Sequence, residues 1–222
     1  MQVALIGATG FVGSALLDEL LLRGHRVVAL AREPAKLVAR PQLQVVQADV
    51  SDAQQVQRAV QGTQAVLSAF NAGWGNPQLY GDFVRGASAI VQGLKAAGVA
   101  RYLVVGGAGS LWVAPGVQLV DTPDFPAAIH PGAAAARDML TALRHELALN
   151  WTLLSPPVGF YGGSPAQLQG RTGRYRVGGE TPLMQPDGSP GDISVQDLAV
   201  ALVDALEQGS HPRARFTVAA AT

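Results

Sequence analysis

Cysteine is absent from this chain of 222 residues, and charged residues make up only 14% of it. Without cysteine the chain has no disulfide bond, no thiol chemistry and no cysteine-ligated metal. Its 16 basic and 16 acidic residues give a formal net charge of zero. Such a balance provides no broad electrostatic surface for nucleic acid or for an anionic membrane. Any charged partner must therefore be recognised locally.

Long apolar runs are missing as well, since no stretch reaches the roughly 18 residues of a membrane-spanning helix. The chain starts MQVALIG and passes directly into a glycine turn, without the basic start of a secretory signal. We therefore expect a cytoplasmic monomer or homodimer that takes a small-molecule substrate and binds neither nucleic acid nor membrane. The histidines show no metal-ligand spacing, so no metal site is expected.

Short apolar runs alternate with helical patterns along the chain, and hydrophobic residues make up 48% of it. Apolar strands that alternate with helices predict a parallel sheet covered on both faces. We expect an α/β, Rossmann-like doubly wound fold, in one domain with a small C-terminal excursion over 158–192. The expected strands are 3–6, 26–31, 43–48, 65–70, 101–105, 151–155 and 216–219. The expected helices are 11–23, 52–60, 79–97, 133–149 and 194–207.

Two of these helices carry finer expectations. Ser51 is expected to cap the helix over 52–60, because a serine oxygen accepts bonds from free helical N–H groups. Met139, Leu143 and Leu147 have the spacing of one face in the helix over 133–149.

A glycine-rich loop joins the first expected strand to the first expected helix, and it reads Gly7-Ala8-Thr9-Gly10-Phe11-Val12-Gly13. In such a loop the first glycine permits a tight turn, the second admits a diphosphate, and the third lets the helix pack on the sheet. Free N–H groups and the helix dipole then favour the phosphates. We predict dinucleotide binding here; the alternative is a purely structural turn. The predicted contacts are Gly7, Thr9, Gly10, Phe11, Val12 and Gly13.

The end of the second expected strand indicates NADP rather than NAD. NAD-selective folds place an acidic residue there, bonded to the ribose 2′-hydroxyl. This chain has Ala31 followed by Arg32, whose guanidinium suits a 2′-phosphate, and Lys36 lies close enough to assist. The alternative for Arg32 is a solvated loop charge.

Two further strand ends supply predicted cofactor contacts. Asp49 and Val50 end the third strand, where the Asp49 carboxylate suits the adenine amino group or, equally, starts a turn or caps a helix. Ala69, Phe70 and Asn71 end the fourth strand, near the expected position of the cofactor ribose.

Seven segments resemble atypical short-chain dehydrogenase/reductases, and among them the flavin-reductase-like or biliverdin-reductase-B-like proteins that bind NAD(P)H. These segments are GATGFVG at 7–13, ALAR at 29–32, QADVSD at 47–52, VVGGAGSL at 104–111, WTLLSPP at 151–157, RTGRYRV at 171–177 and ISVQDLA at 193–199. The resemblance implies that Gly106, Gly107 and Ala108 line the floor beside the nicotinamide. It also implies that Ser155, Pro156 and Pro157 contact the nicotinamide side, and that loops 73–80, 111–130 and 158–192 shape the substrate pocket.

The chain departs from typical short-chain reductases in its acid catalyst. Those enzymes use a Tyr-x-x-x-Lys pair, whereas none of the four tyrosines here has lysine four residues later. His130 is therefore a candidate proton donor, because a free histidine titrates near neutrality. Its alternative is a surface histidine before a helix.

Three residues are candidate substrate contacts. Trp74 and Trp112 lie in loops expected over the pocket, where an aromatic ring stacks on a planar substrate; the alternative is ordinary packing of a loop on the sheet. Arg174, with Arg171 and Arg176, suits an anionic substrate group; the alternative is a solvated hairpin face.

Together these features predict an NADPH-dependent oxidoreductase that transfers hydride to a planar acceptor such as a flavin or quinone-like molecule, with the cofactor supplying the chemistry. One alternative is a non-catalytic NADP(H)-binding regulator that acts through a protein partner. A second is an epimerase- or dehydratase-like sugar enzyme, against which the missing Tyr and Lys argue.

Overall fold

One eight-stranded sheet organises the molecule in the computed structural model, which describes residues 1–221. Its strands are β1 (Gln2–Ile6), β2 (Arg26–Ala31), β3 (Leu43–Gln47), β4 (Ala65–Ser68), β5 (Arg101–Val105), β8 (Asn150–Ser155), β9 (Tyr175–Gly178) and β10 (Ala214–Ala220). Their order is β3-β2-β1-β4-β5-β8-β10-β9. Every neighbouring pair is parallel except β9 and β10. The predicted doubly wound α/β fold is confirmed.

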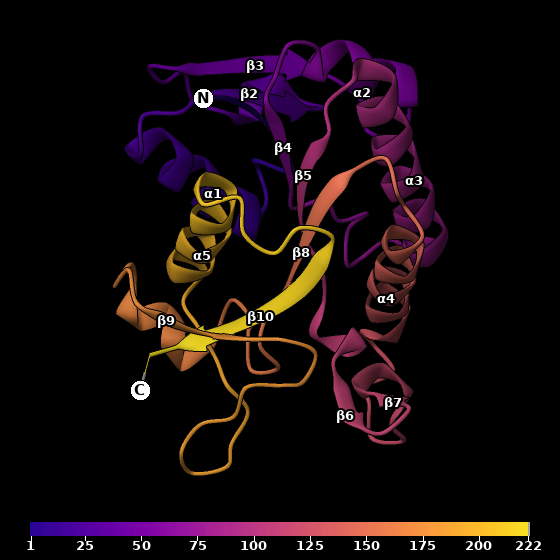
Figure 1. The fold of residues 1–222 in the computed structure, drawn as a ribbon, viewed down its shortest axis with the longest axis vertical. Helices are drawn as coiled ribbons and strands as arrows, with labels where there is room; N and C mark the ends of the chain where they lie inside the picture. The colour runs from indigo at the N-terminus through magenta and orange to yellow at the C-terminus, as the bar shows by residue number, and fades with distance from the viewer. Residues whose placement is uncertain (222) are drawn as a thin grey trace.

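Five α-helices cover the sheet: α1 (Phe11–Leu22), α2 (Ala53–Val60), α3 (Leu79–Ala97), α4 (His130–Arg144) and α5 (Val195–Glu207). Helices α1 and α5 lie on one face, and α2, α3 and α4 lie on the other (Figure 1). The strands are apolar on both sides because both faces are covered. In β1, Val3 and Leu5 join the core under α1 and α5, whereas Ala4 and Ile6 join the opposite core.

Short elements fill the long connections. A hairpin of β6 (Trp112–Ala114) and β7 (Val117–Gln118) follows β5, within the loop expected over 111–130. The single-turn helices are η1 (Pro34–Lys36), η2 (Ala108–Ser110), η3 (Leu119–Asp121) and η4 (Pro165–Gln169).

The two finer helix expectations were wrong in part. Asp52, not Ser51, caps α2, because its carboxylate accepts bonds from the Gln54 and Gln55 N–H groups at 2.8 and 3.2 Å. Helix α4 begins three residues earlier than expected, since Pro131 fits a first turn in which no N–H is needed. It also ends at Arg144, and the chain then turns so that Leu147 is 73% exposed instead of buried on a helix face.

The excursion over 158–192 is tied back to the sheet and to two helices. Strand β9 pairs with β10, and this pairing was not predicted from the sequence. Arg171 donates two bonds to the buried Glu19 of α1, at 2.7 and 2.9 Å. Buried Asp197, in the first turn of α5, accepts the N–H groups of Thr172 and Gly173 at 2.8 and 2.7 Å. The excursion is therefore held by backbone pairing and by two carboxylates.

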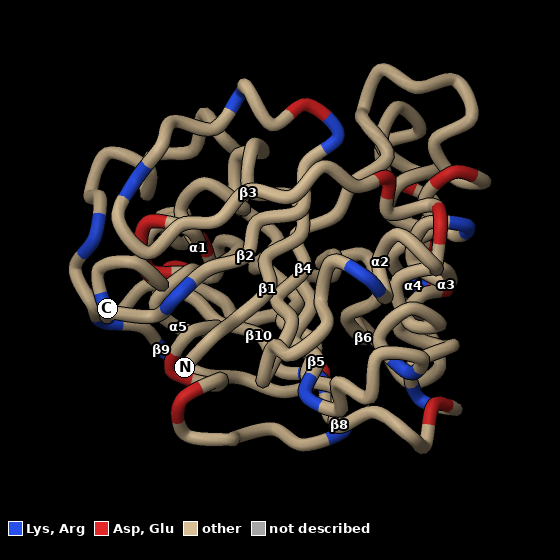
Figure 2. The backbone as a smooth tube through the Cα atoms, turned by 90° about the horizontal axis from the view of Figure 1, so that it is seen from above, with Lys and Arg blue, Asp and Glu red and all other residues tan. Residues whose placement is uncertain are grey.

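Charges are dispersed over the molecule. Figure 2 shows Lys and Arg interspersed with Asp and Glu, and neither sign gathers on one side in that view. Among residues 1–221, no helix combines the length and apolarity that crossing a membrane requires.

The Glu19 contacts generate a prediction about acid stability. Hydrogen bonds from Arg171 and Arg23 lower the pKa of Glu19 below its usual range, although burial opposes them. A depressed carboxyl pKa contributes stability that is present at neutral pH and is lost as the pH falls through the folded-state pKa. We expect Glu19→Gln to cost about 1–3 kcal/mol of unfolding free energy at pH 7 and to reduce the pH dependence below about pH 4.

Chemical denaturation between pH 3 and pH 7 measures this effect. Asp18→Asn is the matched control, because Asp18 is an exposed neighbour whose partner, Arg40, lies at the surface. Equal pH profiles for the two variants would contradict the role of Glu19.

Candidate functional site

The loop between β1 and α1 presents a helix N-terminus to the carboxyl edge of the sheet. Gly10 is the N-cap of α1, no side chain caps the helix there, and its first turn carries no acidic residue. The first N–H groups of a helix lack intrahelical partners, and the helix dipole adds positive potential to them. The loop is therefore suited to bind a diphosphate.

Close backbone packing fixes this loop. Gly7 has φ +85°, and a Cβ there would lie 2.6 Å from the carbonyl oxygen of Ala69. A Cβ on Gly13 would lie 1.9 Å from the carbonyl oxygen of Gly7. Only glycine fits these two positions, so the start of α1 lies directly against the ends of β1 and β4.

A groove of about 430 Å³ runs along this edge, between the glycine loop and the ends of β2, β3 and β4. It is lined by nine of the residues predicted to contact the cofactor: Gly7, Thr9, Gly10, Arg32, Asp49, Val50, Ala69, Phe70 and Asn71. The structure thus brings together residues from four strand ends that are up to 64 positions apart, from Gly7 to Asn71. Their contact with a cofactor stays a prediction.

Arg32 and Lys36, the two cations predicted to bind the 2′-phosphate, have different surroundings. Arg32 is exposed on the groove wall, and within residues 1–221 its guanidinium takes part in no salt bridge. Lys36 lies in η1, pairs with Glu33 at 2.7 Å and does not line the groove. Arg32 is therefore the cation available at the end of β2.

Two polar groups on the groove wall organise local turns. The Asp49 carboxylate accepts the N–H and the hydroxyl of Ser51, at 2.9 and 2.8 Å. The Asn71 side chain accepts the Gly73 N–H at 2.7 Å. In both cases the turn-forming role is present in the structure, and the cofactor role rests on position in the groove.

Sequence reasoning missed the wall that α3 and its preceding loop provide. Asn76, Asp82 and Arg85 line the groove opposite Arg32, together with Ser51 and Ala72. Asp82 accepts bonds from the Asn76 amide, at 2.8 Å, and from the Arg85 guanidinium. These two bonds lower the pKa of Asp82, with the Asn76 contribution the larger. No short motif marks these residues, because they reach the groove only through the placement of α3.

The residues implied for the nicotinamide side lie at neighbouring strand ends. Gly106 and Gly107 follow β5, and Ser155, Pro156 and Pro157 end or follow β8. The Gly106 N–H donates to the Leu154 carbonyl at 2.8 Å, so the two segments are in direct contact. This position, beyond the carboxyl ends of a parallel sheet, is where such folds bind ligands.

Phe11 and Val12 begin α1 and, although predicted to contact the cofactor, do not line the groove. The Phe11 ring packs against Phe160, with 5.7 Å between ring centroids. Val12 is half-buried against the core under α1 and α5.

His130 lies away from the groove. It lines a separate cavity of about 440 Å³ at the start of α4. The His130 and Phe125 rings form a T-shaped pair, with 6.0 Å between the ring centroids. This cavity shares no lining residue with the cofactor groove. The position of His130 agrees with the surface alternative and gives its predicted catalytic role no support.

The predicted substrate contacts are also separated. The Trp74 ring packs on Gly132 in α4 and remains 63% exposed, whereas Trp112 is half-buried in β6. Arg174 is exposed and takes part in no salt bridge within residues 1–221. Arg171 is bound to Glu19, and Arg176 donates to backbone carbonyls, so the three arginines do not act as one cluster.

Three of the four tyrosines are disfavoured as replacements for the missing acid. The hydrogen bond that Tyr80 donates to Asp138 raises the pKa of Tyr80. Burial raises the pKa of Tyr102. Burial is the larger cause of the raised pKa of Tyr175, and its hydrogen bond to Asp204 adds to it. A raised pKa makes a phenol a weaker proton donor at neutral pH.

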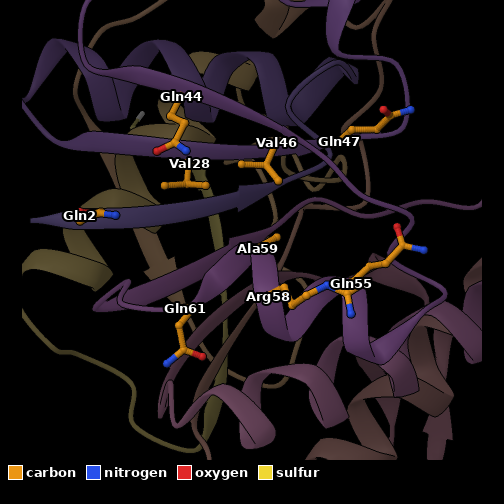
Figure 3. Close-up of a pocket in the computed structure, with 9 residues that line it drawn as sticks. All are labelled: Gln2, Val28, Gln44, Val46, Gln47, Gln55, Arg58, Ala59 and Gln61. Carbon is orange, nitrogen blue, oxygen red and sulfur yellow. The ribbon is translucent and has the colours of Figure 1, made fainter.

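Another groove, of about 320 Å³, lies between β2, β3 and α2 (Figure 3). Its lining includes five glutamines and one charged residue, Arg58. It shares no residue with the cofactor groove. Among the described residues, no group of three or more His, Asp and Glu side chains is arranged to hold a metal ion.

The fold and the groove beside the glycine loop define a Rossmann-type dinucleotide-binding protein. The profile of a family described as NAD(P)H-binding matches residues 7–209. The chain belongs to this NAD(P)H-binding oxidoreductase family, within the atypical short-chain dehydrogenases/reductases, and the resemblance seen in the sequence is confirmed.

Three relatives are similar over nearly their whole length. YwnB of Bacillus subtilis, an uncharacterized protein, is 36% identical over 220 residues, which are 98% of each chain. A structure from Bacteroides thetaiotaomicron, provisionally named an epimerase, is 40% identical, with TM-score 0.88 and coverage of 100% of this chain and 97% of that one. A structure from Streptococcus pneumoniae, provisionally named an NADH-flavin reductase, is 35% identical, with TM-score 0.85 and full coverage of both chains.

The glycine loop generates a paired prediction. We expect Gly13→Ala to lower the unfolding free energy by about 1–3 kcal/mol or more, because its Cβ collides with the Gly7 carbonyl. We expect Gly10→Ala to fold normally, because its Cβ would meet the Gly7 carbonyl oxygen only at 3.4 Å, yet to weaken dinucleotide binding by crowding the diphosphate.

Thermal melts and calorimetry with NADPH measure the two effects separately. An unchanged melting temperature for Gly13→Ala would show that α1 shifts without cost. Unchanged NADPH affinity for Gly10→Ala would place the diphosphate elsewhere.

Proposed function

We propose that this protein transfers hydride from NADPH to a planar aromatic acceptor of the flavin or quinone class. The nicotinamide cofactor carries the hydride when bound. The chain's residues hold the dinucleotide along the carboxyl edge of the sheet and orient the acceptor beside it.

The distribution of exposed aromatic side chains carries this proposal. Within residues 1–221, four aromatic residues are strongly exposed, and all four lie at the carboxyl edge of the sheet. They are Phe11 at the start of α1, Trp74 before α3, Tyr80 in the first turn of α3, and Tyr161 after β8. Exposed aromatic side chains in the loops at this edge are available to a flat, apolar ligand, because stacked rings gain energy beyond simple burial.

The absence of the Tyr-x-x-x-Lys pair fits the same acceptor class. The chain has no Tyr-x-x-x-Lys pair, and three of its four tyrosines have raised pKa values. A flavin takes two electrons as hydride and one proton, which solvent can supply. Reduction of such an acceptor therefore needs less acid catalysis from the protein than reduction of a ketone, because the alkoxide that develops from a ketone needs a positioned proton donor.

The preference for NADPH rests on Arg32. This cation stands on the groove wall after Ala31, where an NAD-selective fold places an acid, and it is free to bind a 2′-phosphate. The relative from Streptococcus pneumoniae bears a name that specifies NADH. Direct comparison of the two cofactors is therefore the decisive measurement for this chain.

Two other functions stay open. The relative from Bacteroides thetaiotaomicron is provisionally named an epimerase, but the missing Tyr and Lys disfavour sugar chemistry here. A regulator that binds NADP(H) without turnover would have the same groove but would not reduce an acceptor.

We propose a small-molecule acceptor, a cytoplasmic location and a monomeric or homodimeric state.

The acceptor proposal is tested by NADPH oxidation with FMN and with a soluble quinone. We expect oxidation with at least one acceptor. We further expect Trp74→Ala or Tyr161→Ala to raise the acceptor KM by about two- to tenfold through lost stacking.

Leu147→Ala is the matched control, because Leu147 is an exposed apolar side chain in the turn before β8, at the opposite edge of the sheet. NADPH binding without oxidation by either acceptor would support the regulator instead.

The cofactor preference is tested by Arg32→Ala. We expect this change to weaken NADPH binding by on the order of 1.5–3 kcal/mol and to leave NADH binding nearly unchanged, because only NADPH carries the 2′-phosphate.

Calorimetry with both cofactors makes the comparison, and Arg40→Ala provides a control in which a cation is removed from a surface pair outside the groove. Equal losses for NADPH and NADH in Arg32→Ala would refute the assignment.

A further inference from the structure

A buried arginine, Arg215 in β10, lies beneath the nicotinamide side of the predicted site. Its side chain is 0% exposed, and it forms an ion pair with Glu180, in the segment after β9. Its Nη1 donates to the hydroxyls of Ser110 and Ser155 at 3.3 and 3.4 Å. Its Nη2 donates to the carbonyls of Ser110 and Glu180 at 3.4 and 3.2 Å. One guanidinium thus joins three chain segments.

Two of these segments are the ones that sequence resemblance assigns to the nicotinamide. Ser155 is the last residue of β8 and directly precedes Pro156 and Pro157. Ser110 donates its hydroxyl to the Gly107 carbonyl at 3.3 Å. A hydrogen-bond chain therefore runs from Glu180 through Arg215 and Ser110 to Gly107, the glycine implied as cofactor floor.

The third segment belongs to the loop over 158–192, which is implied to shape the substrate pocket. Glu180 also pairs with Arg144 of α4 at 2.7 Å, and its carbonyl accepts the Trp112 N–H at 2.9 Å. Burial alone would raise the pKa of Glu180, but Arg215 and Arg144 hold it below the usual range, so the carboxylate is the counter-charge of the buried guanidinium.

Stability alone does not account for this arrangement. The Arg215 guanidinium is fully buried, whereas the Glu180 side chain is 44% exposed, so the guanidinium loses its hydration opposite a partly solvated counter-charge and the pair is weak evidence for a stabilising role. The Nε atom of Arg215 has no hydrogen-bond partner within the described chain, which adds to that cost. A fixed geometry is the benefit that remains, because supporting hydrogen bonds lock the residues of a site in place.

We propose that Arg215 is a positioning residue that sets the nicotinamide floor and joins it to the substrate loop. This inference rests on the proposed binding of NADPH. It assigns Arg215 no contact with the cofactor. The adenosine half, held by the groove near Arg32, lies on other strand ends and is independent of Arg215.

Two probes separate the halves of the site. NADPH reports on the whole site, and adenosine 2′,5′-bisphosphate reports on the adenosine half alone. For Arg215→Met we expect the NADPH Kd to rise at least about tenfold, while the Kd of adenosine 2′,5′-bisphosphate changes by less than about twofold. Arg215→Lys is expected to restore part of the NADPH affinity, because the charge opposite Glu180 is kept.

Thr217→Val is the matched control. Thr217 is two residues along the same strand, lies opposite Ser155 in the sheet, and its buried hydroxyl has no partner within residues 1–221. We expect this variant to bind both probes as the unchanged protein does. Ser110→Ala breaks the link to Gly107 and keeps the Arg215–Glu180 pair, so it serves if Arg215→Met does not fold, and we expect the same selective loss of NADPH affinity.

The outcomes are distinct. A selective loss for NADPH in Arg215→Met or Ser110→Ala supports the positioning role. Equal changes for both probes, or no change, overturn it. If the unchanged protein binds neither NADPH nor adenosine 2′,5′-bisphosphate, the proposed function is refuted instead.

Discussion

The contact between Gly13 and the Gly7 carbonyl is the constraint on which the rest of the structure depends. A helix that starts this close to the end of β1 brings its first N–H groups to the same edge as the ends of β2, β3 and β4. Parallel strands then place the loops that follow them at that edge, so groups distant in sequence meet in one groove. The free N–H groups at the start of α1 and the exposed Arg32 share one groove because of this close approach.

The sequence was sufficient for the parts that depend on local pattern. Apolar strands that alternate with helices predicted the doubly wound sheet, and glycine spacing placed Gly7, Thr9 and Gly10 on the groove. It was insufficient where a contact joins remote segments. Strand β9 is short and partly exposed, so only its pairing with β10 makes it a strand. Asp82 and Arg85 reach the groove because α3 packs on the sheet, and His130 stays apart because α4 begins outside the groove.

Charged groups that join remote segments are of two kinds in this protein. Glu19 and Asp197 hold the excursion over 158–192 to α1 and α5, and they act on the side of the sheet opposite α4. Arg215 and Glu180 lie on the α4 side and join strand ends to a loop. The first kind fixes where the loop lies, and the second joins the segments that follow β5 and end β8 to the segment after β9.

The antiparallel pairing of β9 with β10 also bears on how the loop after β9 can vary. Because β9 is hydrogen-bonded to the sheet on one side and Asp192 is bonded to the Ala220 N–H on the other, the intervening segment over 179–191 is bounded at both ends by rigid backbone. Its tip can change in length or composition without moving the strands whose ends line the groove. A scaffold built in this way separates a loop that is free to vary from the fixed edge of the sheet.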